Sequence, residues 1–308
     1  MSFRISTVYF VIYDKKAGKL FCSRDRFGQK PFYYSLMKGT FGFASELKSL
    51  TKHQNIDTKT KKLSLKKYFA YGYIPAPNTI YEQVYKLPAG HNLTLNIHDL
   101  TFKVEQYWDF VHEPFEVNQN SEKEWAEELV FLLEQAVTRQ LMSDVPLGVF
   151  LSGGVDSSAI LALASRHTPK SELKSFSMGF NEAGFDETHH AKKVAQLFDS
   201  QHFVEKLSIE KALEILPFIV QNLDEPMGDS SILPTYLLSQ MTRKNVTVAL
   251  GGDGADELFG GYEPFKVLRK LELYNKFIPK PVHESIRFLL DFVPSGNKKM
   301  TKNFAFKA

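Results

Sequence analysis

The residues best suited to chemistry form a glycine- and serine-rich segment, Ser152–Ser158 (SGGVDSS), directly after the apolar run Leu147–Leu151. Its paired glycines let the backbone turn tightly and approach a ligand without a Cβ in the way. If a helix starts after them, its first N–H groups lack partners and the positive end of its dipole favours an anion. The segment therefore predicts a phosphate-binding loop, with its ligands drawn from Ser152, Gly153, Gly154, Ser157 and Ser158.

A simpler interpretation of the same segment is an ordinary strand-to-helix turn in which Asp156 or Ser158 caps the helix. Gly-Gly turns are common, but the full pattern of glycines, aspartate and serines after an apolar run is specific, so we favour the phosphate loop. The segment is not a Walker A loop, because no lysine follows the glycines and the spacing differs.

A second glycine-rich segment, Gly251–Tyr262 (GGDGADELFGGY), follows another apolar run, Val246–Leu250. The carboxylates of Asp253 and Asp256 could hold a hard cation such as Mg²⁺ that also contacts phosphate oxygens. An EF-hand calcium loop is excluded, since its alternating acidic positions and its twelfth-place glutamate are absent. Taken alone, the segment could equally be an acidic helix start that complements the helix dipole. Its pairing with the first loop favours the ligand site.

These two loops need a scaffold of alternating strands and helices, which the sequence from Ser121 onward predicts. Ser121 and Glu124 form a capping-box pattern that opens a helix. Apolar runs and helical periodicities then alternate, which predicts a parallel sheet covered by helices on both faces. Ligands bind such sheets at the carboxyl ends of the strands, where both loops lie. The expected strands are Leu147–Leu151, Leu173–Phe180, Gln201–Glu205 and Val246–Leu250, and the expected helices are Val155–Arg166, Glu187–Phe198, Ser208–Asn222 and Leu233–Lys244.

The first part of the chain is expected to be an antiparallel β domain. Thr7–Tyr13 and Lys19–Arg24 flank a turn and form a hairpin pattern. A lysine-rich stretch, residues 59–67, is expected to be a solvated helix face. We therefore predict an α/β protein with an antiparallel β domain over residues 1–112 and a parallel-sheet domain over residues 121–308. Further strands are expected at Pro31–Ser35, Thr40–Ala44, His91–Ile97 and Thr101–Tyr107.

Composition limits the classes of protein that the chain can represent. Its 308 residues, 43% hydrophobic and 24% charged, suit about two soluble domains. The net charge of +3 argues against nucleic acid as the main partner. The apolar run Thr7–Tyr13 is too short for a membrane span or a signal peptide. With one cysteine, Cys22, a disulfide framework is impossible. We expect a cytoplasmic protein with no membrane partner.

The first loop resembles the pyrophosphate loop of the ATP-pyrophosphatase (adenine nucleotide α-hydrolase) superfamily. This resemblance implies that ATP is cleaved between its α- and β-phosphates and that the loop holds the pyrophosphate. Gly251–Tyr262 resembles the Gly-x-Gly-x-Asp-Glu-x-Phe-x-Gly-Tyr signature of asparagine synthetases. Phe176–Phe180 with Phe185–Glu187 is similar to that family's adenine-binding strand, and Asp224–Pro226 with Asp229–Thr235 to its segment on the acyl-acceptor side.

The resemblance assigns roles to individual positions. Asp253 stands where many family members carry glutamate, and His189 and His190 are expected to be helix surface and not metal ligands. The implied cofactors are ATP and Mg²⁺. The implied site has Asp156 and Asp256 at Mg²⁺ and pyrophosphate, and ATP contacts from Phe150, Met178, Asp186, Gly251, Gly252 and Asp253.

The first domain resembles the second half of a class II glutamine amidotransferase, on the evidence of Arg24–Tyr34 and Phe43–Lys48. In that family an N-terminal cysteine attacks the glutamine amide, with its own α-amino group as base. This sequence opens Met1-Ser2, and Cys22 lies within a strand-like run, where a buried structural thiol is expected. The family's Arg-Val-Pro-Phe-Leu-Asp segment has no match in residues 263–308. We expect a truncated chain without glutaminase activity, matched over about residues 7–275.

The expected function is an ATP-dependent ligase that converts aspartate to asparagine through a β-aspartyl-adenylate, with glutamine or ammonia as nitrogen source. Two alternatives stay open: a related amidotransferase that acts on a polysaccharide sugar acid or a β-lactam precursor, and an inactive truncated fragment. A flavodoxin-like module would not explain two glycine-acid loops. The sequence leaves open the acyl acceptor, the activity of this chain, whether Met1 is a natural start, and homodimerisation.

Overall fold

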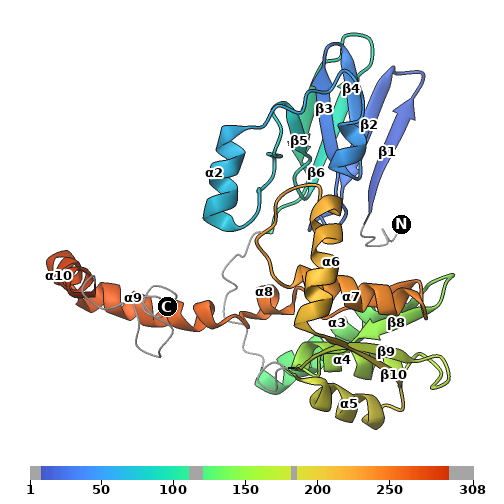
Figure 1. Ribbon diagram of the computed structural model, residues 1–308, viewed down its shortest axis with the longest axis vertical. Coiled ribbons are helices and arrows are strands. Elements are labelled where there is room, and N and C mark those ends of the chain that lie inside the picture. The colour runs from blue at the N-terminus through green and yellow to red at the C-terminus, as the bar shows by residue number, and fades with distance from the viewer. Residues whose placement is uncertain (1–7, 111–120, 182–185, 291–308) are drawn as a thin grey trace. The chain divides into compact units, whose positions relative to one another are not determined.

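The computed structural model describes residues 8–110, 121–181 and 186–290, and Met1-Ser2, Phe185 and the stretch 291–308 lie outside that description. The chain forms two compact units, shown as a ribbon in Figure 1. The first unit joins residues 1–123 to residues 207–237, and the second joins residues 124–206 to residues 238–308. The segment 207–237 therefore packs with a part of the chain that is distant in sequence.

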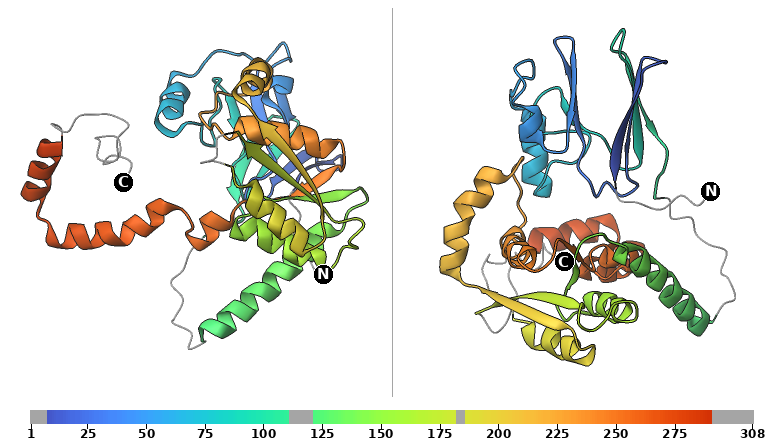
Figure 2. Two further views of the ribbon diagram at one scale, coloured as in Figure 1. Left: turned by 60° about the horizontal axis from the view of Figure 1, so that its bottom comes forward. Right: turned by 90° about the vertical axis from the view of Figure 1, so that its right-hand side faces the viewer.

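Two antiparallel sheets form the first unit (Figure 2). One has the order β1-β2-β6-β7 and the other the order β4-β3-β5. The expected hairpin is confirmed, with β1 and β2 paired from Tyr9↔Arg24 to Asp14↔Lys19. The strands are β1 Tyr9–Asp14, β2 Lys19–Arg24, β3 Tyr33–Met37, β4 Thr40–Ala44, β5 Val84–Lys86, β6 His91–Asn96 and β7 Phe102–Gln106.

The core of the first unit lies between these sheets. Alternate side chains of a strand point to opposite faces, so each sheet offers one apolar face to the other. The cluster contains Cys22, Phe32, Tyr34, Leu87, Leu93 and Leu95, all buried. In the part of this unit that the structure describes, the helices are α1 (Leu47–Leu50), α2 (Lys62–Tyr71), α6 (Ile209–Asn222) and the first residues of α7 (Ile232–Arg243). The lysine-rich stretch does enter a helix, α2, as expected.

Arg24, at the end of β2, ties the following turn to the sheet through backbone carbonyls. Its guanidinium donates to the carbonyl oxygens of Lys30 at 2.8 Å, Gly28 at 2.7 Å and Leu87 at 2.5 Å. Asp25 accepts from the amides of Gln29 at 3.0 Å and Lys30 at 3.1 Å. A planar guanidinium carries several donors in a fixed fork, which a lysine could not replace. In the segment Arg24–Tyr34, Arg24 and Asp25 thus have a structural role.

The second unit holds the predicted parallel sheet, with the strand order β10-β9-β8-β11. β8 pairs in parallel with both β9 and β11, which confirms the expected topology. The strands are β8 Leu147–Phe150, β9 Lys174–Phe180, β10 Gln201–Leu207 and β11 Val248–Leu250. Helix α7 begins in the first unit and ends in the second. The helices are α3 Glu122–Leu141, α4 Val155–Ser165, α5 Thr188–Leu197, α7 Ile232–Arg243, α8 Ala255–Phe259, α9 Glu263–Phe277 and α10 Lys280–Leu290.

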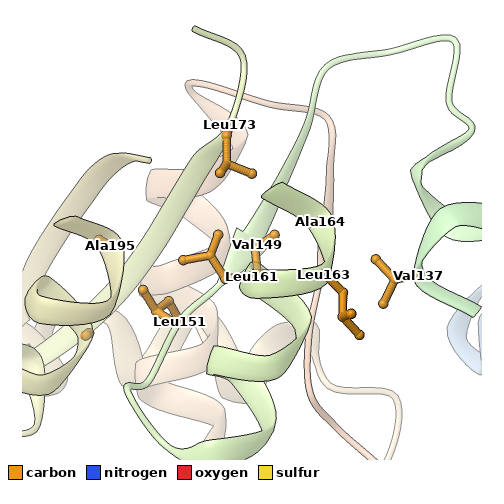
Figure 3. Close-up of a cluster of buried hydrophobic side chains, with 9 residues drawn as sticks. Val137, Val149, Leu151, Leu161, Leu163, Ala164, Leu173 and Ala195 are labelled. Atoms are coloured by element: carbon orange, nitrogen blue, oxygen red, sulfur yellow. The ribbon is translucent and has the colours of Figure 1, made fainter. Parts of the chain in front are cut away.

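Helices cover both faces of this sheet, and the side chains around β8 show why. Val149 and Leu151 point into a cluster formed with α4, α5 and α3 (Figure 3). Phe150, one position between them, packs in a separate cluster with Phe176 and with Met241 of α7. Successive residues of a strand face opposite sides, so a strand buried on both faces is apolar throughout. None of the described helices is both long and apolar enough to span a bilayer.

We predict that the native fold protects the thiol of Cys22 from alkylation. Cys22 is fully buried, and this burial raises the pKa of its thiol to about 12. An unfolded cysteine ionises near pH 8.5. The raised pKa of Cys22 therefore adds to the stability of the folded state below about pH 8.5, and this added stability is lost as the pH rises toward 12. Iodoacetamide at about pH 8.5 should label the chain in concentrated urea and only slowly in native buffer. Equal rates in the two solutions would contradict this burial.

Candidate nucleotide site

The phosphate-loop candidate joins β8 to α4 and leaves the start of that helix without a side-chain cap. Gly154 is the N-cap residue, with extended backbone angles of φ −69° and ψ 166°, and no side chain accepts from the first turn at that position. The alternative in which Asp156 or Ser158 caps the helix is therefore wrong. The first amides of an α-helix have no carbonyl partner within it. Here they remain available to an anion, which the helix dipole also favours.

The serines of the loop hold its shape. The hydroxyls of Ser152 and Ser157 lie 2.9 Å apart and share one hydrogen bond. The amide of Ser152 donates to the Ser157 hydroxyl at 3.2 Å, and the amide of Gly154 donates to the Ser152 hydroxyl at 3.2 Å. Among the described residues, the buried hydroxyl of Ser158 finds no hydrogen-bond partner. Ser152 and Ser157 thus stabilise the turn that exposes the amides.

Gly153 must be glycine for two independent reasons. Its φ of +88° lies in the left-handed region, which side chains with a Cβ disfavour. In addition, a Cβ at this position would lie 2.5 Å from the backbone nitrogen of Ala191 and 2.7 Å from the Cβ of His190. The loop therefore packs directly against the first turn of α5. His189 and His190 are both exposed on that helix, as expected.

The second loop meets the first because β11 lies beside β8. The two strands are parallel, with Leu250 opposite Val149, so both strands end at the same edge of the sheet. A Cβ on Gly252 would lie 3.0 Å from the amide nitrogen of Ser157 and 3.1 Å from the Cβ of Asp156. Gly252 thus leaves open the space beside the first turn of α4. The expectation that the two loops come together is confirmed.

The second loop carries several carboxylates in and just before α8. Glu257 accepts a hydrogen bond from the hydroxyl of Tyr262 at 2.6 Å. That bond lowers the pKa of Glu257 and is the main cause that raises the pKa of Tyr262 to about 12, to which the charges of Asp256 and Asp253 add. The Glu257–Tyr262 pair was not among the predicted site residues. Its only signal in the sequence is that both belong to the Gly251–Tyr262 segment.

The site offers two candidate carboxylates for a magnesium ion, not a complete set of ligands. Asp156 is exposed on the first turn of α4, and Asp256 is half-buried in α8. Within residues 8–110, 121–181 and 186–290, no three histidine, cysteine, aspartate or glutamate side chains converge as metal ligands. Mg²⁺ is commonly held by one or two carboxylates with phosphate and water oxygens. The carboxylate oxygens at this edge of the sheet are of the kind that binds Mg²⁺.

The other predicted contacts lie on the neighbouring strand ends. Phe150 packs into the core beside Phe176, and Met178 is half-buried on β9. The carboxylate of Asp186 accepts from the amide of Thr188 at 3.1 Å and lies 3.8 Å from the ammonium of Lys206. The hydrogen bonds from Thr188, more than the lysine, lower the pKa of Asp186. Asp186 therefore organises the start of α5 and keeps its negative charge at neutral pH.

A cavity of about 570 Å³ lies away from these loops. Its lining includes Leu147, Lys174 and Val246, which stand at or before the amino ends of β8, β9 and β11. Ligands of parallel sheets bind at the carboxyl ends of the strands. This cavity is therefore not part of the candidate nucleotide site.

Comparison with known proteins identifies both parts of the chain. Residues 128–304 match the family model described as asparagine synthase, and residues 5–108 match that of a glutamine amidotransferase domain. A putative asparagine synthetase [glutamine-hydrolyzing] 2 from Methanocaldococcus jannaschii is 42% identical over 259 residues, which is 82% of this chain and 49% of that protein. Asparagine synthetase [glutamine-hydrolyzing] 1 from Bacillus subtilis is 35% identical, over 93% of this chain and 44% of its own length. The chain spans about half the length of these relatives.

Among solved structures, an NH₃-dependent NAD synthetase from Campylobacter jejuni matches with a TM-score of 0.31 and 15% identity. The match covers 46% of this chain and 61% of that one. A glutamine-dependent NAD⁺ synthetase from Acinetobacter baumannii, solved with ADP, matches with a TM-score of 0.33 and 17% identity, over 66% of this chain and 40% of its own.

We predict that Gly252→Ala weakens ATP binding by about tenfold or more, because the added Cβ would occupy the space beside the Ser157 amide. Isothermal titration with ATP in magnesium buffer measures the change. Gly39→Ala is the control, since its φ of +70° strains an alanine while a Cβ there meets no atom within 4 Å. The control should lose about 1 kcal/mol of stability and bind ATP normally. ATP binding by Gly252→Ala as tight as that of the parent chain would refute the role of this space.

Proposed function

The chain belongs to the asparagine synthase family, and on that premise we propose that it is an ATP-dependent ligase that amidates aspartate to asparagine. The observation that carries the proposal is the meeting of two loops at the ends of β8 and β11, where Gly252 faces the uncapped start of α4. One loop offers backbone amides to an anion, and the other brings carboxylates to the same edge of the sheet. This combination suits a bound nucleotide triphosphate with a cation.

The proposed reaction has two steps. An oxygen of the aspartate β-carboxylate attacks the α-phosphorus of ATP, the bond to the bridging oxygen of the β-phosphate breaks, and pyrophosphate leaves with the electron pair. Ammonia then attacks the carbonyl carbon of the β-aspartyl-adenylate, AMP leaves, and the nitrogen gives up one proton to form the neutral amide. Because the adenylate is itself reactive, the protein mainly has to align the reactants and stabilise developing charge.

Each part of the site has a proposed task in these steps. The first-turn amides of α4, held open by the Ser152–Ser157 hydrogen bonds, receive the β- and γ-phosphate oxygens that depart as pyrophosphate. Phe150, Met178, Asp186, Gly251 and Asp253 are proposed to border the nucleotide. Asp156 and Asp256 would hold Mg²⁺, which would neutralise phosphate charge.

Glutamine or free ammonia is the proposed nitrogen source, since residues 5–108 match a glutamine amidotransferase domain. Cys22 does not serve as the nucleophile for glutamine. It is fully buried within β2, and its raised pKa keeps it a thiol at neutral pH, whereas attack on an amide requires an accessible thiolate. Ammonia is therefore the nitrogen donor for tests on this chain.

We predict that Asp156→Asn lowers aspartate-dependent exchange of pyrophosphate into ATP by about 100-fold or more, because charge stabilisation at the phosphates is lost. The fold should persist, since Asp156 is exposed. The control is Asp144→Asn, an exposed carboxylate that precedes the opposite end of β8. Exchange is measured with labelled pyrophosphate, and circular dichroism monitors folding. Unchanged exchange in a folded Asp156→Asn variant would show that Asp156 has no role in the site.

The acid substrate is tested in the same assay. Aspartate should support exchange, whereas glutamate and sugar acids such as glucuronate should not, because attack on the α-phosphate requires the carboxylate to be aligned and acids of another length or shape place it differently. If another acid supports exchange better than aspartate does, aspartate is not the substrate and the amide product is a different one.

A further inference from the structure

The segment Asn222–Gly228, between α6 and α7, makes contacts that the nucleotide chemistry does not use. It lies within the asparagine synthase match at residues 128–304, yet it packs in the first unit with the amidotransferase match at residues 5–108. Figure 2 shows the loop that follows α6 reaching the end of α2. The amide of Gly228 donates to the carbonyl of Gly72, the C-cap residue of α2, at 2.7 Å. We call Asn222–Gly228 the latch segment.

Asp224 supplies the cap of a helix that is distant in sequence. Its two carboxylate oxygens accept from the amides of Leu47 at 2.7 Å and Lys48 at 3.1 Å, the first amides of α1. The N-cap residue of α1, Glu46, provides no side-chain cap of its own. The ammonium of Lys48 returns a bond to the carbonyl of Asn222 at 3.0 Å. A carboxylate at a helix N-terminus satisfies orphan donors and complements the helix dipole.

Glu225 forms the buried half of the latch segment. One oxygen accepts from the amide of Ile80 at 2.7 Å, and the other pairs with the ammonium of Lys86 on β5. The side chains of Lys86 and Glu225 are only 17% and 11% exposed. Lys86 also donates to the carbonyl of Ile74 at 2.6 Å. Breaking such a pair on one side leaves an uncompensated buried charge, so each partner depends on the other.

The electrostatics of the first unit agree with this placement. Burial is the main cause that raises the pKa of Tyr33 on β3 to about 12, and the charges of Glu225 and then Asp224 add to it. Both carboxylates therefore lie close to the amidotransferase sheet. Asp224 thus accepts from two backbone amides, and Glu225 accepts from one backbone amide and pairs with a buried cation.

The latch segment contains Asp224–Pro226 and continues into Asp229–Thr235, the acceptor run, and both stretches belong to the segment that resembles the acyl-acceptor side of asparagine synthetases. Within this run the amide of Ser231 donates to the carboxylate of Asp229 at 2.8 Å. From Ile232 onward the run lies in α7, whose later residues Leu238 and Met241 pack in the core beside Phe176 of the second unit. The acceptor run therefore connects the latch segment to the ATP-binding sheet along the chain.

We propose that Asp224 and Glu225 are positioning residues that anchor the acceptor run to the amidotransferase domain, so that this domain sets the affinity for the acid substrate. The proposal rests on the proposed function, because the acceptor run is assigned through it. Neither carboxylate is expected to touch ATP. Loosening the latch segment should therefore weaken the affinity for the acid substrate and leave the affinity for ATP unchanged.

The first test is amide hydrogen exchange on the intact chain, without substrates. Glu225→Gln keeps an acceptor for Ile80 but leaves the ammonium of Lys86 without its carboxylate, and it should speed exchange across residues 229–235. Removing both partners in Lys86→Met/Glu225→Gln should slow that exchange again, since no unpaired buried charge remains. Glu214→Gln, an exposed carboxylate on α6 with no bonded partner among the described residues, should match the parent. Faster exchange confined to residues 78–82 would overturn the anchoring role.

The second test compares KM for the acid with KM for ATP in ammonia-dependent asparagine formation. Glu225→Gln should raise KM for the acid by about five- to tenfold while KM for ATP changes less than about twofold. A purely structural role would alter both constants together or neither, and either result overturns the proposal. If the parent chain shows no turnover with any acid, the proposed function fails, while hydrogen exchange still decides the anchoring role.

Discussion

The parallel pairing of β8 with β11 is the constraint on which the candidate site depends. These strands are far apart in sequence, but their hydrogen-bonded register places Leu250 opposite Val149. Because both strands run in the same direction, the loops that follow them emerge at one edge of the sheet. Gly252 then approaches Asp156 and Ser157 closely enough that a Cβ would crowd them. Without this pairing, each loop would be an ordinary turn.

Packing on both faces of the sheet secures that pairing. Val149 and Leu151 face one layer of helices, while Phe150 faces Phe176 and α7 on the other side. The loop is fixed from behind by Gly153, which packs against α5. The hydroxyls of Ser152 and Ser157 bond to each other and hold the turn. A rigid frame of this kind can present backbone amides to phosphate oxygens without reorganisation, which is how fixed dipoles stabilise charge in enzymes.

Much of this scaffold follows from local sequence patterns. The hairpin of β1 and β2, the strand β8 and the helix α4 all have signals within a few residues, because side-chain periodicity and turn residues act locally. The meeting of the two glycine loops followed from the rule for parallel sheets. The capping of α1 by Asp224 could not be predicted, since its donors lie 177 and 176 residues away and a lone Asp-Glu pair has no distinguishing pattern. The three-residue strand β5 was likewise too short to carry a signal.

We infer that the Ser152–Ser158 and Gly251–Tyr262 loops form one nucleotide site. Amide hydrogen exchange with and without ATP and Mg²⁺ tests that claim most directly, because bound phosphate should protect the amides that it receives. We predict slower exchange in both loops together, and no change around residues 167–173 beside the cavity at the other edge of the sheet. Protection of only one loop, or protection that appears first at residues 167–173, would contradict a shared site.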